Sequence, residues 1–387
     1  MQQETAMDGV CIEQPPEQSP EYIQCLQSLV HSWGTLKQKG FIIDQLSASD
    51  LEKRKRCQRC CRALNAAKQK KTADHKRRSS ASPSRDGSAV VPGYRDRTSM
   101  SANPASGSFA PKGKTTASNS NSKLECRYHD GQMDRKTKKW TCCNMGMFTK
   151  PCKATEDHDP RRYRPSELET NWRFHHTPPA TPHSPAHVAV VFDCEMGVTE
   201  EGESELIRVS VVDYFTSAVL LDSLVWPDVR MKDLSTPFSG VSWKALNDAR
   251  RNKTCLFGRE KARKAVWSLI SPETVVIGHG ANNDLNILRW IHPNIVDTLL
   301  VEQRLREKEN EAKEQEAKTD DQQEAEIKPS GGGGGGGGGM SLKKLAKDRL
   351  GRVIQAKGRG HDSIEDSIAT RDILHWHVSR ILQSGEP

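Results

Sequence analysis

Short apolar runs separated by turn residues dominate the chain after about residue 187. Four of them, each bounded by Gly, Ser, Asp or Pro, predict strands at 187–196, 207–213, 219–226 and 273–279. Apolar positions at helical spacing predict helices at about 258–270, 282–290, 341–350 and 364–382. Strands that first form a meander and then alternate with helices favour a mixed sheet flanked by helices, and hence an α/β fold.

The first half of the chain has a different pattern. Residues 1–66 carry helical patterning and end in a Cys-x2-Cys pair. Residues 67–122 are rich in Lys, Ser, Ala, Gly and Pro and predict a disordered basic linker. A compact Cys/His segment follows at 123–165. A Pro-rich linker at 166–186 then leads into the patterned domain at 187–383.

One low-complexity insert, 302–340, interrupts the patterned domain. Its first part could form a highly charged, solvent-exposed helix, and its run of nine glycines cannot hold regular structure. We interpret it as a tolerated surface insertion.

Composition narrows the class of protein. Only 34% of the 387 residues are hydrophobic and 28% are charged, so the apolar residues must be concentrated for part of the chain to fold. The net charge of +8 and a pI near 8.9 fit an anionic partner. Without a run of 18 apolar residues or an apolar leader, we expect a soluble intracellular protein. The KK and HKRR runs of the linker could be a nuclear address, a phosphate-binding tether or merely solubilising.

The stretch VVFDCEMG places two acids in an apolar strand. Side chains alternate along a strand, so Asp193 and Glu195 point the same way while Cys194 points the other way. Two neighbouring carboxylates repel each other and are costly to bury without a counter-ion. A divalent metal between them is the natural candidate.

Two more acids follow in similar surroundings. Asp284 falls on the first turn of a predicted helix after GHGANN, and His361 precedes a helix that carries Asp366. Four carboxylates and a histidine are the inventory for two-metal phosphodiester hydrolysis. Each later acid also has a structural explanation, because Asp284 could favour the helix dipole and Ser363 with Asp366 fits a capping box.

The order DCEMG, GHGANND, HDSIED resembles the DEDDh exonucleases, the ribonuclease-H-like family of 3′-to-5′ nucleases. RVSVVD, TPFSGVS, IVDTLL, SLKKLA and HDSIEDSIAT are similar to the Rex-type RNA exonucleases over roughly 188–382, apart from the insert. The resemblance implies a mixed five-stranded sheet flanked by helices, preceded here by a small zinc-binding region and disordered linkers. It also implies hydrolysis at RNA 3′ ends that releases nucleoside 5′-monophosphates.

The resemblance also assigns roles in a site with two Mg²⁺ or Mn²⁺ ions. Asp193, Glu195 and Asp366 match the ligands of the first ion, with Asp193 bridging to a second that Asp284 helps to hold. His361 matches the general base. Three residues match the substrate-binding lining: Cys194, Met196 and Gly197. Met196 could equally be core packing. The chain departs from many relatives at Gly280 and in the long insert, which could alter access to the 3′-end cleft.

Seven of the eleven cysteines lie between residues 57 and 152, with histidines among them, which favours metal binding in a reducing compartment over disulfides. Short paired spacings separated by a loop suit tetrahedral zinc. The candidate ligands are Cys126 and His129, Cys142 and Cys143, Cys152 and His158, with Cys57 and Cys60 as a further pair. These residues suffice for one or two structural Zn²⁺, and the choice between Cys142 and Cys143 stays open.

The segment resembles the cysteine-rich region that precedes the nuclease domain in some larger Rex-type exonucleases. Lys136, Lys138 and Lys139 beside Trp140 could hold RNA, although zinc could merely staple a small domain. We therefore predict a 3′-to-5′ exonuclease acting on single-stranded RNA 3′ ends, in the nucleus and possibly also the cytoplasm. The rival hypotheses are a catalytically silent RNA- or protein-binding module and a DNA-directed exonuclease.

Overall fold

The computed structural model describes two compact units. Described are residues 16–64, 126–134, 136–146, 149–180, 186–320, 339–356, 358 and 360–385. The "sheet unit" comprises the chain up to Glu52 and from Tyr163 onward, and the "Cys/His unit" comprises 53–162. The predicted basic linker at 67–122 and positions 321–338 of the insert lie outside the described residues.

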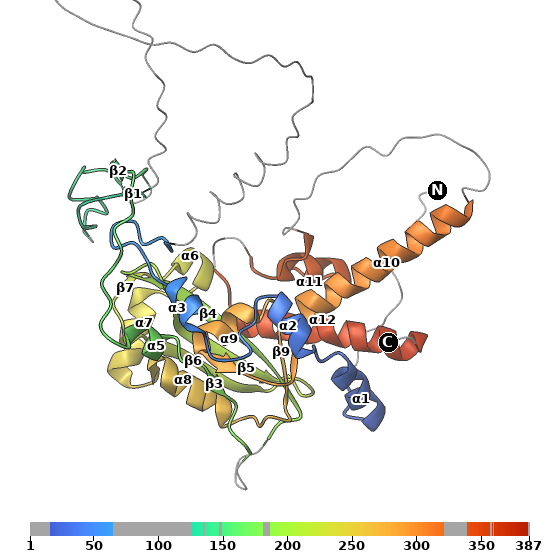
Figure 1. Ribbon diagram of the computed structural model, residues 1–387. Helices are drawn as coiled ribbons and strands as arrows, with labels where there is room; N and C mark the ends of the chain where they lie inside the picture. Colours follow the sequence, from blue (N-terminus) through green and yellow to red (C-terminus); the bar gives the residue numbers. More distant parts are fainter. Residues whose placement is uncertain are drawn as a thin grey trace, which may run out of the picture. The chain divides into compact units, whose positions relative to one another are not determined.

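A mixed sheet forms the centre of the sheet unit (Figure 1), with strand order β11-β9-β4-β5-β6-β8 and with β7 paired to β4. The strands are β4 (Ala189–Thr199), β5 (Ser204–Asp213), β6 (Val219–Trp226), β7 (Met231–Asp233), β8 (Leu256–Phe257), β9 (Val275–Gly278) and β11 (Ile295–Asp297). Strands β4, β5 and β6 are antiparallel, whereas β9 runs parallel to both β4 and β11. The five strands from β11 to β6 confirm the predicted α/β sheet, and two short strands extend it.

Helices cover both faces of the sheet. On one face, α8 (Gly258–Trp267) and α9 (Asn282–Leu288) pack in a core cluster with Phe192 of β4. On the other, α12 (Ser363–Ser384) and α1 (Pro20–Ser28) pack with Val191. The alternation of β4 thus sends Val191, Asp193 and Glu195 toward the α12 face.

The remaining helices and strands are short, apart from α10. They are α2 (Trp33–Gln38), α3 (Ala48–Glu52), α5 (Glu167–Asn171), α6 (Thr236–Ser239), α7 (Trp243–Asn252), α10 (Thr298–Asp320), α11 (Leu342–Leu350), β1 (Cys126–Tyr128), β2 (Lys153–Thr155), β3 (His175–His176) and β10 (Trp290–Ile291). Within the part of the chain that the structure describes, none of the helices is both long and apolar enough to cross a membrane.

The N-terminal segment belongs to the sheet unit, which differs from the predicted 1–66 segment. The hydroxyl of Tyr22 lies 2.7 Å from both Tyr214 Oη and His375 Nδ1. Leu36 and Phe41 join the core cluster of the α9 face. The boundary between units therefore follows α3, because the apolar residues before it have partners in the sheet unit.

The predicted Pro-rich linker at 166–186 also contains packed structure. Leu168, Trp172 and Phe174 are buried and form a cluster with Ile291, and β3 pairs in parallel with β10. The guanidinium of Arg289 lies 3.7 Å from the centre of the Trp172 ring. The interpretation of this segment as a linker, made from its proline content, therefore missed three large apolar side chains that are buried.

The start of the predicted insert is part of the core. Glu302 is fully buried, and its carboxylate accepts hydrogen bonds from Arg306 Nε at 2.7 Å and Arg349 Nη2 at 2.8 Å, with His377 Nε2 at 3.3 Å. Burial alone would raise the pKa of Glu302, but these three neighbours lower it to about 2. The first turns of α10 are thus part of the core of the sheet unit. The surface insertion therefore begins after them, and not at residue 302 as predicted.

The Cys/His unit has little apolar content. Strands β1 and β2 pair antiparallel, and isolated bridges join Cys57 to Pro160 and Met133 to Trp140. Among the described residues, every hydrophobic core cluster lies in the sheet unit. A unit this small and this poor in apolar contacts needs another source of stability, such as a metal.

Candidate catalytic and metal sites

Strand β4 supplies the first two acids from the middle of the sheet. Asp193 pairs with Ser210 of β5 and Glu195 with Arg208, and a register shift follows Glu195. The side chain of Glu195 is buried, and that of Asp193 is half-buried. Because both side chains are partly or fully buried, little water is available to solvate the two carboxylates.

Asp284 reaches β4 from the first turn of α9. Strand β9 pairs with β4 only as far as Ile277 opposite Val191, so the next part of β4 is not covered by β9. There the backbone N–H of Cys194 donates to Asp284 Oδ1 at 3.1 Å. The helix-dipole explanation is therefore incomplete, since this carboxylate also holds α9 against the strand that carries Asp193.

Asp366 and His361 come from the N-terminal end of α12. His361 Nδ1 lies 3.6 Å from Asp366 Oδ2, and Gln355 Nε2 donates to the same oxygen at 3.0 Å. The helix cap is Asp362, which accepts from Ile364 N, whereas the Ser363 hydroxyl lies 2.6 Å from that of Ser210. The capping-box explanation of Asp366 is therefore wrong, and its burial needs another reason.

Burial raises the pKa of all four acids, and for Asp193 and Glu195 the neighbouring carboxylates raise it further. Burial, followed by the charges of Asp284, Glu195 and Asp366, raises the pKa of Asp193 well above its ordinary value. Burial, followed by the charge of Asp366, raises the pKa of Glu195 to about 8. Burial raises the pKa of Asp284 to about 8, against the hydrogen bond from Cys194. The protein alone thus resists full ionisation of this cluster.

A divalent cation fits these residues. Ligand atoms of Glu195, His361 and Asp366 all lie within 4.8 Å of one another. Glu195 Oε1 and Asp366 Oδ1 are buried without a hydrogen-bond partner among the described residues. Buried carboxylate oxygens without donors are the oxygen ligands that Mg²⁺ or Mn²⁺ takes. The carboxylates also need positive charge, which the cation supplies.

A cleft of about 750 Å³ opens beside His361. Its wall includes Arg208, Asp362 and Glu365, together with Gly240 and Gly360. A side chain on Gly360 would collide with the backbone of Gly240, so these two glycines let the loop that carries His361 approach α6 closely. The N–H of His361 donates to the carbonyl of Phe238 in α6, which fixes the histidine at the cleft.

The three residues predicted to line the substrate site are on β4, beside the two acids of that strand. Cys194 packs in the core of the α9 face, and half-buried Met196 packs against the same cluster. Gly197 is in close contact with Met231 and Asp233, which leave no room for a side chain. Like the four acids, none of the three is in the wall of this cleft, and their role as substrate lining stays a prediction. The packing of Met196 is compatible with its alternative assignment as core.

Three positioning residues were missed by the sequence reasoning. Asp297 is buried at the end of β11 and accepts hydrogen bonds from the N–H groups of Gly280 and Ala281, just before α9. Burial raises the pKa of Asp297 to about 6 in spite of these bonds. Arg208 donates to Asp222 and Asp362, and Gln355 donates to Asp366. The only sequence signal was Asp297, the acid in IVDTLL, and no second residue at strand or helix spacing pointed to its role.

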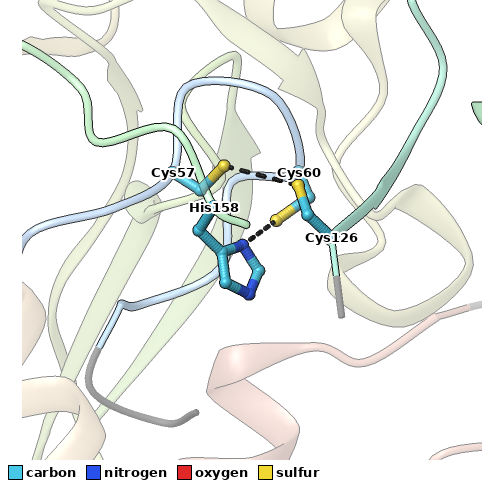
Figure 2. A group of neighbouring side chains, drawn as sticks. All are labelled: Cys57, Cys60, Cys126 and His158. Carbon is cyan, nitrogen blue, oxygen red and sulfur yellow. Dashed lines mark hydrogen bonds between the residues drawn. The ribbon is translucent and has the colours of Figure 1, made fainter. Parts of the chain in front are cut away.

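The Cys/His unit brings the eight predicted zinc ligands into two groups of four. Figure 2 shows the first group, Cys57, Cys60, Cys126 and His158. Cys57 Sγ lies 3.7 Å from Cys126 Sγ, and Cys60 Sγ lies 3.3 Å from His158 Nδ1. A tetrahedral zinc with Zn–S bonds of about 2.3 Å separates its sulfur ligands by about 3.8 Å. The group therefore has the size of a zinc site.

The second group consists of His129, Cys142, Cys143 and Cys152. Cys142 Sγ lies 3.5 Å from Cys152 Sγ, and Cys143 Sγ lies 3.6 Å from His129 Nδ1. The rings of His129 and Trp140 stack at 4.3 Å, which orients the imidazole. Both Cys142 and Cys143 belong to this group. Two expected pairs are split between the groups, Cys126 from His129 and Cys152 from His158.

The close approach of the ligands in the first group also shifts the pKa values of its thiols. Burial would raise the pKa of Cys57, but the backbone N–H groups of Cys60 and Arg59 outweigh it and lower the pKa to about 6. Burial and the neighbouring thiols raise the pKa of Cys126. One thiolate forms readily and the next is then opposed, which is the balance that a bound Zn²⁺ resolves.

No model of a known protein family matches the chain. "RNA exonuclease 3" of Candida albicans is 31% identical over 264 residues, which cover 67% of this chain and 56% of that protein. "RNA exonuclease 3" of Saccharomyces cerevisiae is 29% identical over 263 residues, 65% of this chain and 54% of that protein. The predicted resemblance to the RNA exonucleases is confirmed. The chain spans about half the length of these two RNA exonucleases.

Among solved structures, the Neurospora crassa Pan2 catalytic unit, described as a protease and nuclease domain, is 19% identical to this chain. It matches 57% of this chain and 33% of its own, with a TM-score of 0.38.

Proposed function

We propose that the sheet unit is a 3′-to-5′ exoribonuclease that releases nucleoside 5′-monophosphates from single-stranded RNA. The observation that carries the proposal is the metal-sized group of Glu195, Asp366 and His361. Asp284 and Asp193 lie beside it, since Asp284 bonds to Cys194 N–H and the charges of Asp284, Glu195 and Asp366 act on Asp193. Relatives named RNA exonuclease, which match about two thirds of this chain, support RNA as the polymer.

Each residue has a part in the proposed reaction. Two divalent ions held by Asp193, Glu195, Asp284 and Asp366 would neutralise the phosphate and lower the pKa of a bound water. His361 accepts the proton of the attacking water, and Asp366 orients the imidazole and stabilises its protonated form. The water oxygen forms the new bond to phosphorus as the bond to O3′ of the preceding nucleotide breaks. O3′ takes a proton from solvent, and His361 afterwards returns its proton to solvent. Arg208, at the wall of the cleft, pairs with Asp222 and with Asp362, the residue after His361, and so helps to hold the histidine segment in place.

The Cys/His unit would hold two structural zinc ions, supported by two groups of four ligands with spacings of tetrahedral size. Lys136, Lys138 and Lys139 are exposed and could contact RNA phosphates. Trp140, which follows these lysines in the chain, stacks on His129 of the second group. We further propose that the protein acts in RNA processing in the nucleus, on the strength of the basic runs in 67–122.

The test uses single-stranded RNA labelled at either the 3′ or the 5′ end, with Mg²⁺ or with EDTA. Wild-type protein should release labelled mononucleotide from the 3′ end first, only with metal. Asp193→Asn, which keeps the side-chain shape and removes the charge, should lower the rate by about 10³-fold or more. Glu201→Gln, an exposed acid just beyond β4, is the matched control and should retain the wild-type rate.

The alternatives give different results. A folded wild-type protein that binds RNA but degrades neither labelled strand would identify a silent binding module. Faster release from a DNA of the same sequence would make DNA the substrate. Release from the 5′ end would contradict the proposed direction.

A further inference from the structure

Helix α7 exposes a basic and aromatic stripe on the surface of the sheet unit. Five residues spaced one helical turn apart line a shallow hollow of about 660 Å³: Trp243, Lys244, Asn247, Arg250 and Arg251. The indole of Trp243 is 41% exposed, which is unusual for a side chain of this size. The surface has room and chemistry for a ligand.

The opposite side of the same helix forms part of the catalytic cleft. Ala245 and Ala249 of α7, with Val241 before it, line the wall of the cleft that also contains His361. These side chains are small, so the cleft and the stripe are separated by little more than the backbone of α7. A polymer that leaves the cleft over this helix meets the stripe next.

The charges of the stripe favour an anion. Lys244, Arg250 and Arg251 carry three positive charges, and Asp248, which pairs with Lys244 and Arg251, carries one negative charge. The Arg250 guanidinium lies 4.4 Å from the centre of the Trp226 ring, which holds it in place without neutralising it. Arginine next to an exposed indole suits a single-stranded nucleic acid, because phosphates pair with the cation and bases stack on the ring.

We propose that the stripe on α7 binds the RNA segment that lies upstream of the 3′ end held in the cleft. Arg250 and Arg251 contact backbone phosphates, and Trp243 stacks against a base. This inference rests on the proposed function, because it takes the cleft as the place where the 3′ end is hydrolysed. It identifies long single-stranded RNA as the preferred substrate class, since a dinucleotide is too short to reach both surfaces.

The test measures RNA binding and hydrolysis separately in the full chain. Binding of fluorescein-labelled oligouridylate is followed by anisotropy in EDTA, which prevents cleavage. Hydrolysis is followed with the p-nitrophenyl ester of uridine 5′-monophosphate in Mg²⁺, a substrate that occupies only the cleft. The variants are Trp243→Ala and the double variant Arg250→Gln/Arg251→Gln. The control is Lys261→Gln/Lys264→Gln, which removes the same charge from exposed positions of α8.

We expect Trp243→Ala to weaken oligouridylate binding about tenfold, from the loss of one base stack. The double arginine variant should reduce the slope of log Kd against log salt by about 1.4, which is two phosphate contacts to a single strand. Ester hydrolysis should be unchanged, and the α8 control should bind like wild type.

Oligouridylate affinity equal to wild type in both α7 variants would overturn the proposal. So would an equal loss in the α8 control, because the effect would then be one of net charge alone. Equal loss of ester hydrolysis and binding would also overturn it, by showing damage to the whole unit. If wild type binds oligouridylate through α7 but hydrolyses neither RNA nor ester, the proposed function fails and the binding surface stands.

Discussion

At the scale of single residues, burying the four ionised acids together without a cation costs free energy. Asp193, Glu195, Asp284 and Asp366 converge from three elements, and each has its pKa raised by burial. For Asp193 and Glu195, the neighbouring carboxylates add to that effect. The folded state therefore keeps protons that the unfolded chain would release. A divalent cation removes this conflict, so metal binding and folding stability must be linked.

This linkage gives a pH dependence with a definite sign. The pKa of Glu195 and of Asp284 is about 8 in the folded state, against 4.5 and 3.8 ordinarily. Between these values the unfolded chain binds fewer protons, so the free energy of unfolding of the metal-free protein should fall as pH rises from about 4 to about 8. Saturating Mg²⁺ should raise the melting temperature more near pH 8 than near pH 5.

Thermal melts in EDTA and in Mg²⁺ at several pH values measure this effect. Asp193→Asn should raise the melting temperature in EDTA and reduce the shift caused by Mg²⁺, whereas the exposed control Glu201→Gln should change neither. A metal-induced shift that is the same at every pH would show that the cluster is not the site of the linkage.

The sequence placed the four acids and His361 because their unusual surroundings are local, within a strand or a first helical turn. It could not assign Asp297, Arg208 or Gln355, because their roles depend on partners brought close only by folding. Asp297 holds backbone N–H groups 16 and 17 positions away, and Gln355 reaches Asp366 from the loop after α11. The adjacent residues in the sequence do not predict such contacts.

At the scale of elements, the two Cys/His groups are nested. The second group, from His129 to Cys152, lies in the chain between Cys126 and His158 of the first. Cys126 is buried at the start of β1, and His129 follows the end of that strand, so they reach different groups. This nesting could not be predicted from the sequence, because the short Cys-x2-His spacing suggested two ligands from a single turn.

Adjacent cysteines offer a matched test of the first group. Cys60 is a member of it, whereas Cys61, the next residue, is outside both groups. Wild-type protein should contain two zinc ions per chain. Cys60→Ser should lose about one of them and Cys61→Ser none, as measured by elemental analysis of purified protein. Two zinc ions in Cys60→Ser, or one in Cys61→Ser, would contradict the assignment.

At the scale of the whole molecule, the sheet unit is built from both sides of the Cys/His unit in the sequence. Helix α1 packs on α12 through Leu26 and Leu29, and Tyr22 joins Tyr214 and His375. Composition did not predict this arrangement, since helical patterning in 20–30 indicates an apolar face without naming the surface that covers it. The N-terminal segment should therefore contribute to the stability of the sheet unit.

Leu26 allows this contribution to be measured. It is fully buried, so Leu26→Ala should lower the free energy of unfolding of the sheet unit by about 2–5 kcal/mol. Gln27→Ala, at the next and exposed position of α1, should change it by less than about 0.5 kcal/mol. Urea unfolding followed by tryptophan fluorescence provides the comparison. Equal effects of the two substitutions would show that α1 does not pack as described.

The first Cys/His group also bears on whether the stretch between Cys60 and Cys126 is needed to connect the two ends of the chain that it joins. Two of its ligands stand before this stretch in the chain and two after it, so a bound zinc ion would join the same two ends that the peptide backbone joins. A nick anywhere in the stretch would leave the pieces attached to each other. Loop-closure entropy grows only slowly with length, so a change in the number of residues between Cys60 and Cys126 should cost this join little.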